Sequence, residues 1–405
     1  MASPLPIHDQ VSIPVAAGDM QASAADFSTS KPLAEQAATL SISCMMDAKQ
    51  FPPWSDLRPE LLGLVLKRLP SLADRVRLRA VCHPWRFNTI SETLPLPFPW
   101  LTLPNGSFLS IPGGEIHCMP VPNGASCHGS IDNSLFLMSS DVAAWQKEID
   151  AHAHGPVSYK LVASSPPDSS PKWLAASLII GNGYSDNICI IKPRVAAYSF
   201  KPSVGPYPLV DFVFFGGRLH IVSEFFKLFT VDFSEDLESN ANISCAIDSI
   251  GDFLGPAKYL DPKRYYELEQ YLVESGGKLF MVQRFMALEG FRSLHTVGFK
   301  VLEADMRTNP GQWRMVNDLG GHSLFLGKQS SKSLPAEESC GLQEDCIYFI
   351  CDYPCPESSA NPLHDAGIYN MRSGTIMPLH SGSSAVPQRQ AGQWGLTWFF
   401  PPEAV

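Results

Sequence analysis

The sequence predicts a small all-α module followed by an all-β domain with the repeat pattern of a β-propeller. Three observations support this fold class. Residues 54–92 carry apolar side chains at helical spacing. From Pro95 onward, short runs of alternating apolar and polar residues are separated by Gly, Pro, Asn and Asp, which is typical of antiparallel strands. Two of these runs, residues 210–222 and 271–282, repeat one another.

The charge and the apolar pattern exclude several classes of protein. The chain has 405 residues, with 30 basic and 40 acidic side chains and a net charge of −10. A general nucleic-acid binder would need a basic surface to displace phosphate counterions. No apolar run approaches the ~18–20 residues of a membrane-spanning helix, and the N-terminal residues lack the features of a secretory signal. We therefore expect a protein of the cytoplasm, the nucleus or both, with reduced thiols and without membrane or nucleic-acid partners.

Residues 1–50 are rich in Ala, Ser and Gln without a sustained period, so we expect a disordered tail. Residues 51–95 form the predicted helical module. Ser55 or Asp56 can cap a first helix that ends at Pro70, and Ser71 can open a second helix in a capping-box arrangement. The apolar positions are Leu61, Leu62, Val65, Leu66 and Leu69 in the first helix, and the expected buried side of the second is Leu72, Val76, Ala80 and Val81. So small a unit usually completes its core against a partner.

The β domain, residues 96–405, contains the internal repeat. Both copies contain Gly-Gly followed by a basic residue, Leu, an aromatic residue or His, an aliphatic residue and Val. Each copy is followed by a second pair of predicted strands. Four strands per repeat are the content of a propeller blade, and at ~40–50 residues per blade the domain has room for about five to seven blades. We expect the apolar segments 99–103 and 397–400 to share a blade and close the ring. A β-sandwich with added hairpins is the alternative.

Several segments resemble one known family. In residues 54–92, WSDL, ELL, VL, RLPSLADR, RAVC and WR are similar to an F-box, and most similar to its plant form. The matching side chains are Leu57, Pro59, Glu60, Leu61, Leu62, Val65, Leu66, Leu69, Pro70, Leu78, Val81, Cys82, Trp85 and Arg86. Downstream, residues 99–122, 271–285, 296–305 and the closing TWFFPP resemble the kelch-like C-terminal domain of the KIB-type F-box family.

The resemblance implies a non-catalytic subunit of a Skp-cullin-F-box ubiquitin ligase that uses no cofactor or metal. Its helical module would bind a Skp-type adaptor, and through it a cullin, while the propeller would bind an unknown target protein. The implied adaptor-binding residues are Leu57, Pro59, Leu61, Leu62, Leu66, Leu69, Val81 and Trp85. Two features depart from the family: Arg58 follows Leu57 where proline is usual, and residues 141–156 replace a strand that ends in an Asn-Pro-Leu turn.

The basic side chains of the helical module are expected to frame an acidic surface of the adaptor. They are Lys67, Arg68, Arg75, Arg77, Arg79 and Arg86. An apolar surplus, Leu57, Leu62, Leu66 and Val81, is expected to meet either the propeller or a partner.

Other functions remain as alternatives: a propeller enzyme or binding protein for carbohydrate or small molecules, and an F-box scaffold that does not lead to degradation. No complete catalytic motif supports an enzyme, because Asp186 replaces the last Gly of a dinucleotide-type fingerprint and Gly321-His-Ser323 lacks the last Gly of a nucleophile elbow. Cys340, Cys346, Cys351 and Cys355 suggest zinc. Strand alternation, however, separates Cys346 from Cys351, so we expect buried thiols and no metal.

Overall fold

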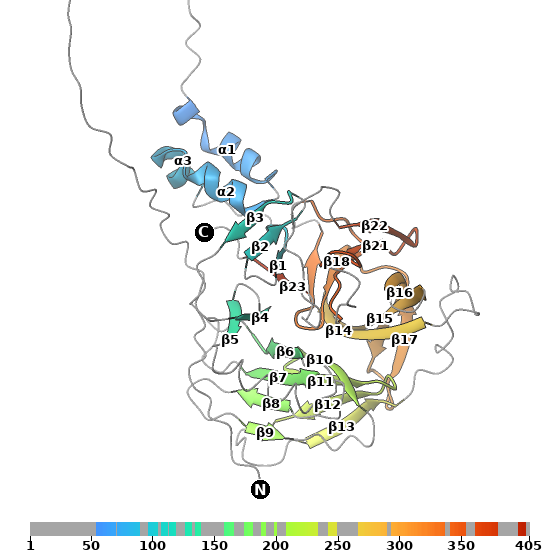
Figure 1. Cartoon of the computed structure of the whole chain (residues 1–405). Helices are drawn as coiled ribbons and strands as arrows, with labels where there is room; N and C mark the ends of the chain where they lie inside the picture. Colours follow the sequence, from blue (N-terminus) through green and yellow to red (C-terminus); the bar gives the residue numbers. More distant parts are fainter. Residues whose placement is uncertain are drawn as a thin grey trace, which may run out of the picture.

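The computed structural model consists almost entirely of strands, with a few helices near its start (Figure 1). It describes residues 54–69, 71–89, 96–103, 107–111, 113–118, 126–131, 134–138, 158–165, 174–180, 188–191, 198–200, 208–233, 242–248, 266–289, 293–336, 341–353, 361–379 and 396–401. The predicted tail over residues 1–50 and the unusual segment 141–156 lie outside these residues. Among the helices of the described ranges, none has the length and apolar character needed to cross a membrane.

The described helices are short and lie together at one end of the molecule (Figure 1). They are η1 (Trp54–Asp56), α1 (Pro59–Leu66), α2 (Leu72–Arg79) and α3 (His83–Asn88). Helix α1 begins at Pro59, where a missing N–H costs nothing because the first turn has no intrahelical acceptor for it. The expected cap at Ser55 or Asp56 is wrong, since Arg58 holds the N-cap position. Ser71 precedes α2 as predicted, but its side chain forms no cap hydrogen bond.

The described strands form six sheets. In spatial order, the first sheet contains β23 (Thr397–Phe399), β1 (Trp100–Thr102), β2 (Ser107–Ser110) and β3 (Ile116–Cys118), and the second contains β4 (Ser126–Ile131) and β5 (Ser134–Met138). The third contains β6 (Ser158–Ala163), β7 (Ala175–Ile180), β8 (Ile188–Ile191) and β9 (Tyr198–Phe200), and the fourth contains β10 (Leu209–Phe215), β11 (Arg218–Ser223), β12 (Leu228–Asp232) and β13 (Asn242–Ile247). The fifth contains β14 (Tyr266–Ser275), β15 (Lys278–Glu289), β16 (Ser293–Asp305) and β17 (Gln312–Val316), and the sixth contains β19 (Lys332–Pro335), β18 (His322–Leu326), β20 (Cys346–Phe349), β21 (Gly367–Asn370) and β22 (Thr375–Pro378).

The two predicted repeat units are the sheets β10–β13 and β14–β17, each with four antiparallel strands. Their first hairpins turn at Gly216-Gly217 and Gly276-Gly277, where all four residues have φ between 56° and 77°. A two-residue hairpin turn with two positive φ values is of type I′, which matches the right-handed twist of the strands. The Gly pairs of the repeat are therefore turn residues. The last sheet departs from this plan, because β18 and β20 pair in parallel.

The first and last strands of the β domain pair with each other. Strand β1 lies antiparallel to β23, with Leu101 opposite Trp398, as expected for the segments 99–103 and 397–400. Trp398 is fully buried, and its indole Nε1 donates a hydrogen bond to the carbonyl of Leu326 at 2.8 Å. The C-terminal strand thus joins the sheet of β1 to the neighbouring sheet of β18.

Helix α2 packs on the sheet of β1 (Figure 1). Leu72 and Ala73 contact a cluster formed by Trp100, Phe108 and Phe399. At the edge of this contact, Arg77 Nη2 lies 3.1 Å from Glu115 Oε2 in the turn before β3. This side of α2 is therefore occupied by the β domain.

His220 on β11 makes folding sensitive to acid. Burial lowers the pKa of its imidazole to about 4, against about 6.5 in an unfolded chain. The unfolded chain therefore takes up this proton at higher pH, so the stability contributed by neutral His220 is fully present above pH 6.5 and is lost as the pH falls toward 4. We expect a loss of about 3 kcal/mol from this residue over that range.

Urea unfolding of wild type and His220→Gln across this pH range checks the prediction. The stability of the variant should fall less steeply, because only the wild type carries the buried imidazole. Two parallel stability curves would show that His220 does not cause the acid sensitivity.

Candidate partner-binding site

Helix α1 has one buried apolar side and one exposed apolar side. Leu62 and Leu66 are completely buried and form its inner side. Leu61, Leu64 and Val65, at positions i, i+3 and i+4, share the other side and are 40%, 50% and 43% exposed. A helix that only packed on its own domain would carry polar side chains there. The outward side of α1 therefore has the composition of a contact surface.

Helix α2 buries arginines and exposes an aliphatic residue. Arg75 and Arg79 are enclosed, although both were expected at the surface, while Val76 is 48% exposed. Arg75 Nε donates to the carbonyl of Leu69 at 2.8 Å, and Arg79 Nη2 donates to that of Thr89 at 3.0 Å. These bonds explain the arrangement, because the two guanidinium groups link the helix to the chain on either side of it. Burial also lowers the pKa of Arg79.

Two predictions about this module are wrong. Val76, Ala80 and Val81 do not form the buried side of α2, since all three are exposed. The basic side chains do not all frame an outer surface either. Arg75 and Arg79 are interior, and Arg77 pairs with Asp74 and Glu115. Lys67, Arg68 and Arg86 are exposed.

The structure divides the predicted adaptor-binding residues into two groups. Leu62 and Leu66 are completely buried, so their side chains are not on the surface that a partner would meet. Pro59, Leu61 and Val81 are exposed, and Val81 shows 63% of its surface. Leu57, Leu69 and Trp85 are half-buried, and the Trp85 indole donates to the carbonyl of Trp54 at 2.8 Å.

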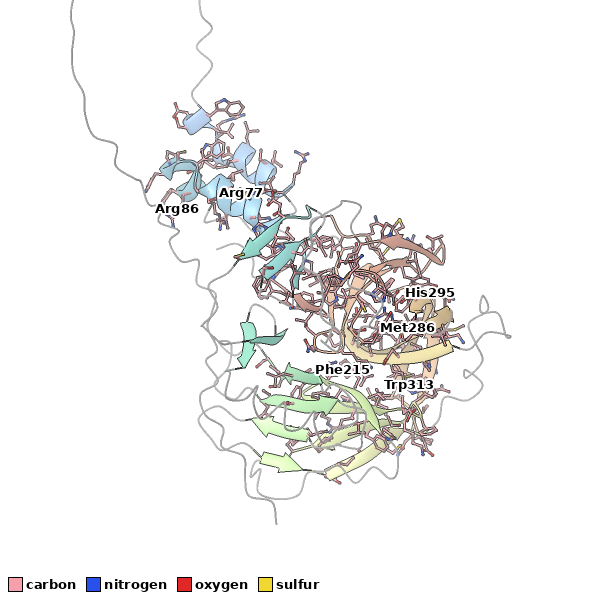
Figure 2. All side chains as sticks on the ribbon, viewed as in Figure 1. Arg77, Arg86, Phe215, Met286, His295 and Trp313 are labelled. Atoms are coloured by element: carbon pink, nitrogen blue, oxygen red, sulfur yellow. The ribbon has the colours of Figure 1, made fainter. Side chains whose placement is uncertain are left out.

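Sequence reasoning missed part of the exposed set. We call the following side chains the apolar surface: Trp54, Leu61, Leu64, Val65, Val76, Val81 and Phe87. The signal for Leu64 was its spacing from Leu61, since i and i+3 lie on one helix face. Trp54 and Phe87 have no such spacing in the sequence, and only the folded structure shows that they are exposed. Figure 2 shows this module with its projecting side chains and labels Arg77 and Arg86 on it.

A second concentration of functional groups lies inside the β domain. Arg284 on β15 is fully buried, and its guanidinium donates to Asp352 Oδ1 at 3.0 Å and to Asp365 Oδ2 at 2.7 Å. Burial acts to lower the pKa of Arg284, but Tyr271, Asp352 and Asp365 hold it above the ordinary value. Burial raises the pKa of Asp352.

These buried charges connect sheets to one another. Arg284 joins the sheet of β14–β17 to the segments that carry Asp352 and Asp365, which flank β20 and β21. Lys160 on β6 pairs with Asp211 on β10 at 2.5 Å, and Asp211 also accepts a hydrogen bond from the backbone N–H of Leu272 on β14. These groups are enclosed and bonded to one another. They therefore hold neighbouring sheets together and do not form a site open to substrate.

The cysteines considered for zinc lie in different surroundings. Cys346 and Cys351 are both buried but belong to separate core clusters. Cys346 Sγ lies 3.6 Å from Asn370 Nδ2, and Cys351 Sγ lies 4.0 Å from the carbonyl of Tyr353. Cys340 and Cys355 fall outside the described ranges.

Comparison with known proteins agrees with this architecture. The KIB1-4 beta-propeller family model matches residues 88–370. The chain belongs to this family. An F-box protein of Arabidopsis thaliana is 23% identical over 329 residues, which cover 74% of this chain and 96% of that protein. The family match begins at the last residue of α3, so α1 and α2 lie before it. The mostly β architecture is consistent with a propeller, and a β-sandwich is not supported.

Proposed function

We propose that this protein is the substrate-recognition subunit of a Skp-cullin-F-box ubiquitin ligase. The helical module binds a Skp-type adaptor, and through it a cullin, while the propeller holds a target protein. The protein does no bond chemistry itself. It brings a target lysine near a ubiquitin-loaded enzyme and so raises their effective concentration. It would act in the cytoplasm, the nucleus or both.

The apolar surface of the helical module is the observation that carries this proposal. The exposed aliphatic side of α1 is not needed for packing inside the module, because Leu62 and Leu66 are the buried side chains of this helix. Exposed apolar side chains that share one helix face, as Leu61, Leu64 and Val65 do, are typical of protein interaction sites. The Arabidopsis relative is named an F-box protein, which supports an adaptor as the partner. Leu57, Pro59, Leu61, Val81 and Trp85 remain the proposed adaptor contacts, whereas Leu62, Leu66 and Leu69 support the helix from inside or at its end.

We also propose the division of the chain and the closure of the propeller. Residues 1–50 form a tail, residues 51–95 the F-box module and residues 96–405 a ring of about five to seven blades, of which the described strands form six sheets. The pairing of β1 with β23 supports ring closure, because it joins the two ends of the domain. An F-box scaffold without degradation would share this architecture and differ only in the fate of its partner.

Affinity purification from cells treated with a cullin inhibitor tests the proposal. We expect the wild-type chain to recover a Skp-type adaptor and a cullin, and Leu61→Asp to recover neither, because a carboxylate replaces an apolar contact in the interface. Met315→Asp is the matched control, since Met315 is an apolar side chain of similar exposure on β17. Recovery of the adaptor by Leu61→Asp, or its absence from the wild-type sample, would refute the proposal.

A further inference from the structure

A hollow beside the repeated Gly-Gly turns has the features of a binding site. Its volume is about 400 Å³, near the lower end of the ~300–1,000 Å³ of ligand sites. Its lining includes Phe214 and Phe215 at the end of β10, Ser164 after β6 and Glu274 near the end of β14. Phe215 is labelled in Figure 2. Three neighbouring sheets thus contribute to one hollow.

The two Gly-Gly turns leave this hollow open. Gly216, Gly217 and Gly277 are part of its lining. A Cβ atom built on any of these three residues would meet no heavy atom within 4 Å, so no described residue fills the space directly above the turns. The positive φ values keep side chains out of these positions. An incoming chain can therefore approach the turns closely.

The charge of the hollow selects a cation. Glu274 is the sole ionisable group among the described residues that line it. Its Oε1 accepts a hydrogen bond from the backbone N–H of Gly277 at 3.1 Å, which holds the carboxylate at the rim. The neighbouring base, Lys278, is paired with Glu303 at 3.0 Å. In the described part of the chain, no basic side chain forms an ion pair with Glu274.

A planar cation fits these groups better than a compact one. A guanidinium can form two parallel hydrogen bonds to a carboxylate and can also stack on an aromatic ring. Phe215 is half-buried at the hollow and offers such a ring. A smaller hollow of about 180 Å³ on the other side of the Gly276-Gly277 turn is lined by Lys278, Asp318 and His322. Its mixed charges do not favour a cation in the same way.

We propose that the hollow between Phe215 and Glu274 binds an arginine side chain of a partner protein. The guanidinium pairs with the Glu274 carboxylate and lies against Phe215, while the partner backbone crosses the Gly-Gly turns. This site is separate from the apolar surface of the helical module. It can therefore be tested whether or not the chain binds a Skp-type adaptor.

The test uses N-acetyl-arginine methylamide as the probe and its neutral citrulline analogue as the control ligand. The full-length protein is labelled with ¹⁵N-glycine, so that Gly216, Gly217 and Gly277 report on the hollow, while Gly367 on β21 and Gly374 in the turn to β22 report on another sheet. We expect a saturable shift of the three turn signals with the arginine probe and about tenfold weaker binding of the citrulline probe. Gly367 and Gly374 should not respond.

Two variants make the assignment specific. Glu274→Gln keeps an acceptor for the Gly277 N–H but removes the charge, and should weaken arginine binding about fivefold without changing the melting temperature. Glu344→Gln is the matched control, because Glu344 is an exposed carboxylate in the turn before β20 that pairs with Arg372, and it should bind like wild type. Equal shifts from arginine and citrulline, unchanged binding by Glu274→Gln, or no saturable shift in wild type would each overturn the proposal.

Discussion

Deletion of residues 396–405 is expected to abolish the cooperative unfolding of the β domain. The deletion removes β23 and with it two buried rings, Trp398 and Phe399, which belong to different core clusters. Loss of one buried Trp or Phe side chain costs about 3–5 kcal/mol, and a whole domain is stable by about 5–15 kcal/mol. The deletion also uncovers the edge of β1, which can then pair with other chains. The truncated protein should therefore aggregate.

Thermal unfolding followed by circular dichroism, together with size-exclusion chromatography, measures this result. Deletion of residues 402–405 alone is the control, because it keeps β23 and should leave the melting temperature unchanged. Trp398→Ala should lie between the two, with a loss of about 3–5 kcal/mol. If the protein that ends at residue 395 melts cooperatively at the wild-type temperature, pairing of the chain ends does not hold the domain together.

Arg284→Met is expected to lower the free energy of unfolding by about 3–5 kcal/mol at neutral pH. Methionine can fill much of the space but cannot replace the hydrogen bonds to Asp352, Asp365 and the carbonyl of Ile350. The variant leaves two buried carboxylates without this cation, and burial already raises the pKa of Asp352. Because the folded variant then takes up protons more readily than the unfolded chain, its deficit relative to wild type should shrink as the pH falls.

Urea unfolding at neutral and mildly acidic pH checks both parts of this expectation. Arg218→Met is the matched control, since Arg218 pairs with Asp232 at the surface and exposed pairs contribute about 0–1 kcal/mol. Equal decreases in the free energy of unfolding of the two variants would show that the hydrogen bonds of Arg284 do not hold the sheets together.

Local signals in the sequence predicted much of the β domain. The Gly-Gly pairs identified the hairpin turns because only glycine readily adopts two consecutive positive φ values. The alternating apolar runs identified the strands of both repeat units, and the apolar segments near residues 100 and 398 identified the pairing of the ends. The parallel pair β18 and β20 was not predicted, because β19 lies between them in the sequence but on the far side of β18 in the sheet.

The functional residues were harder to assign, since burial of a side chain depends on the whole fold. Apolar spacing in α1 could not show which of its two apolar sides faces inward. Leu62 and Leu66 were therefore predicted to bind the adaptor, although both are completely buried. The hydrophobicity of Val76 suggested burial, but Arg75 and Arg79 take the interior positions through hydrogen bonds to backbone carbonyls. Arg284, Asp352 and Asp365 meet only in the folded chain, and their spacing carries no signal.

Calorimetric titration of the purified full-length protein with a purified Skp-type adaptor is the most direct test of the central claim. We expect the wild-type chain to form a one-to-one complex, and Leu61→Asp to weaken binding on the order of a thousandfold while keeping the wild-type melting temperature. Leu62→Ala, at the neighbouring buried position, should instead lower the melting of the helical module. No binding by the wild-type protein, or undiminished binding by Leu61→Asp, would contradict an adaptor contact through the exposed side of α1.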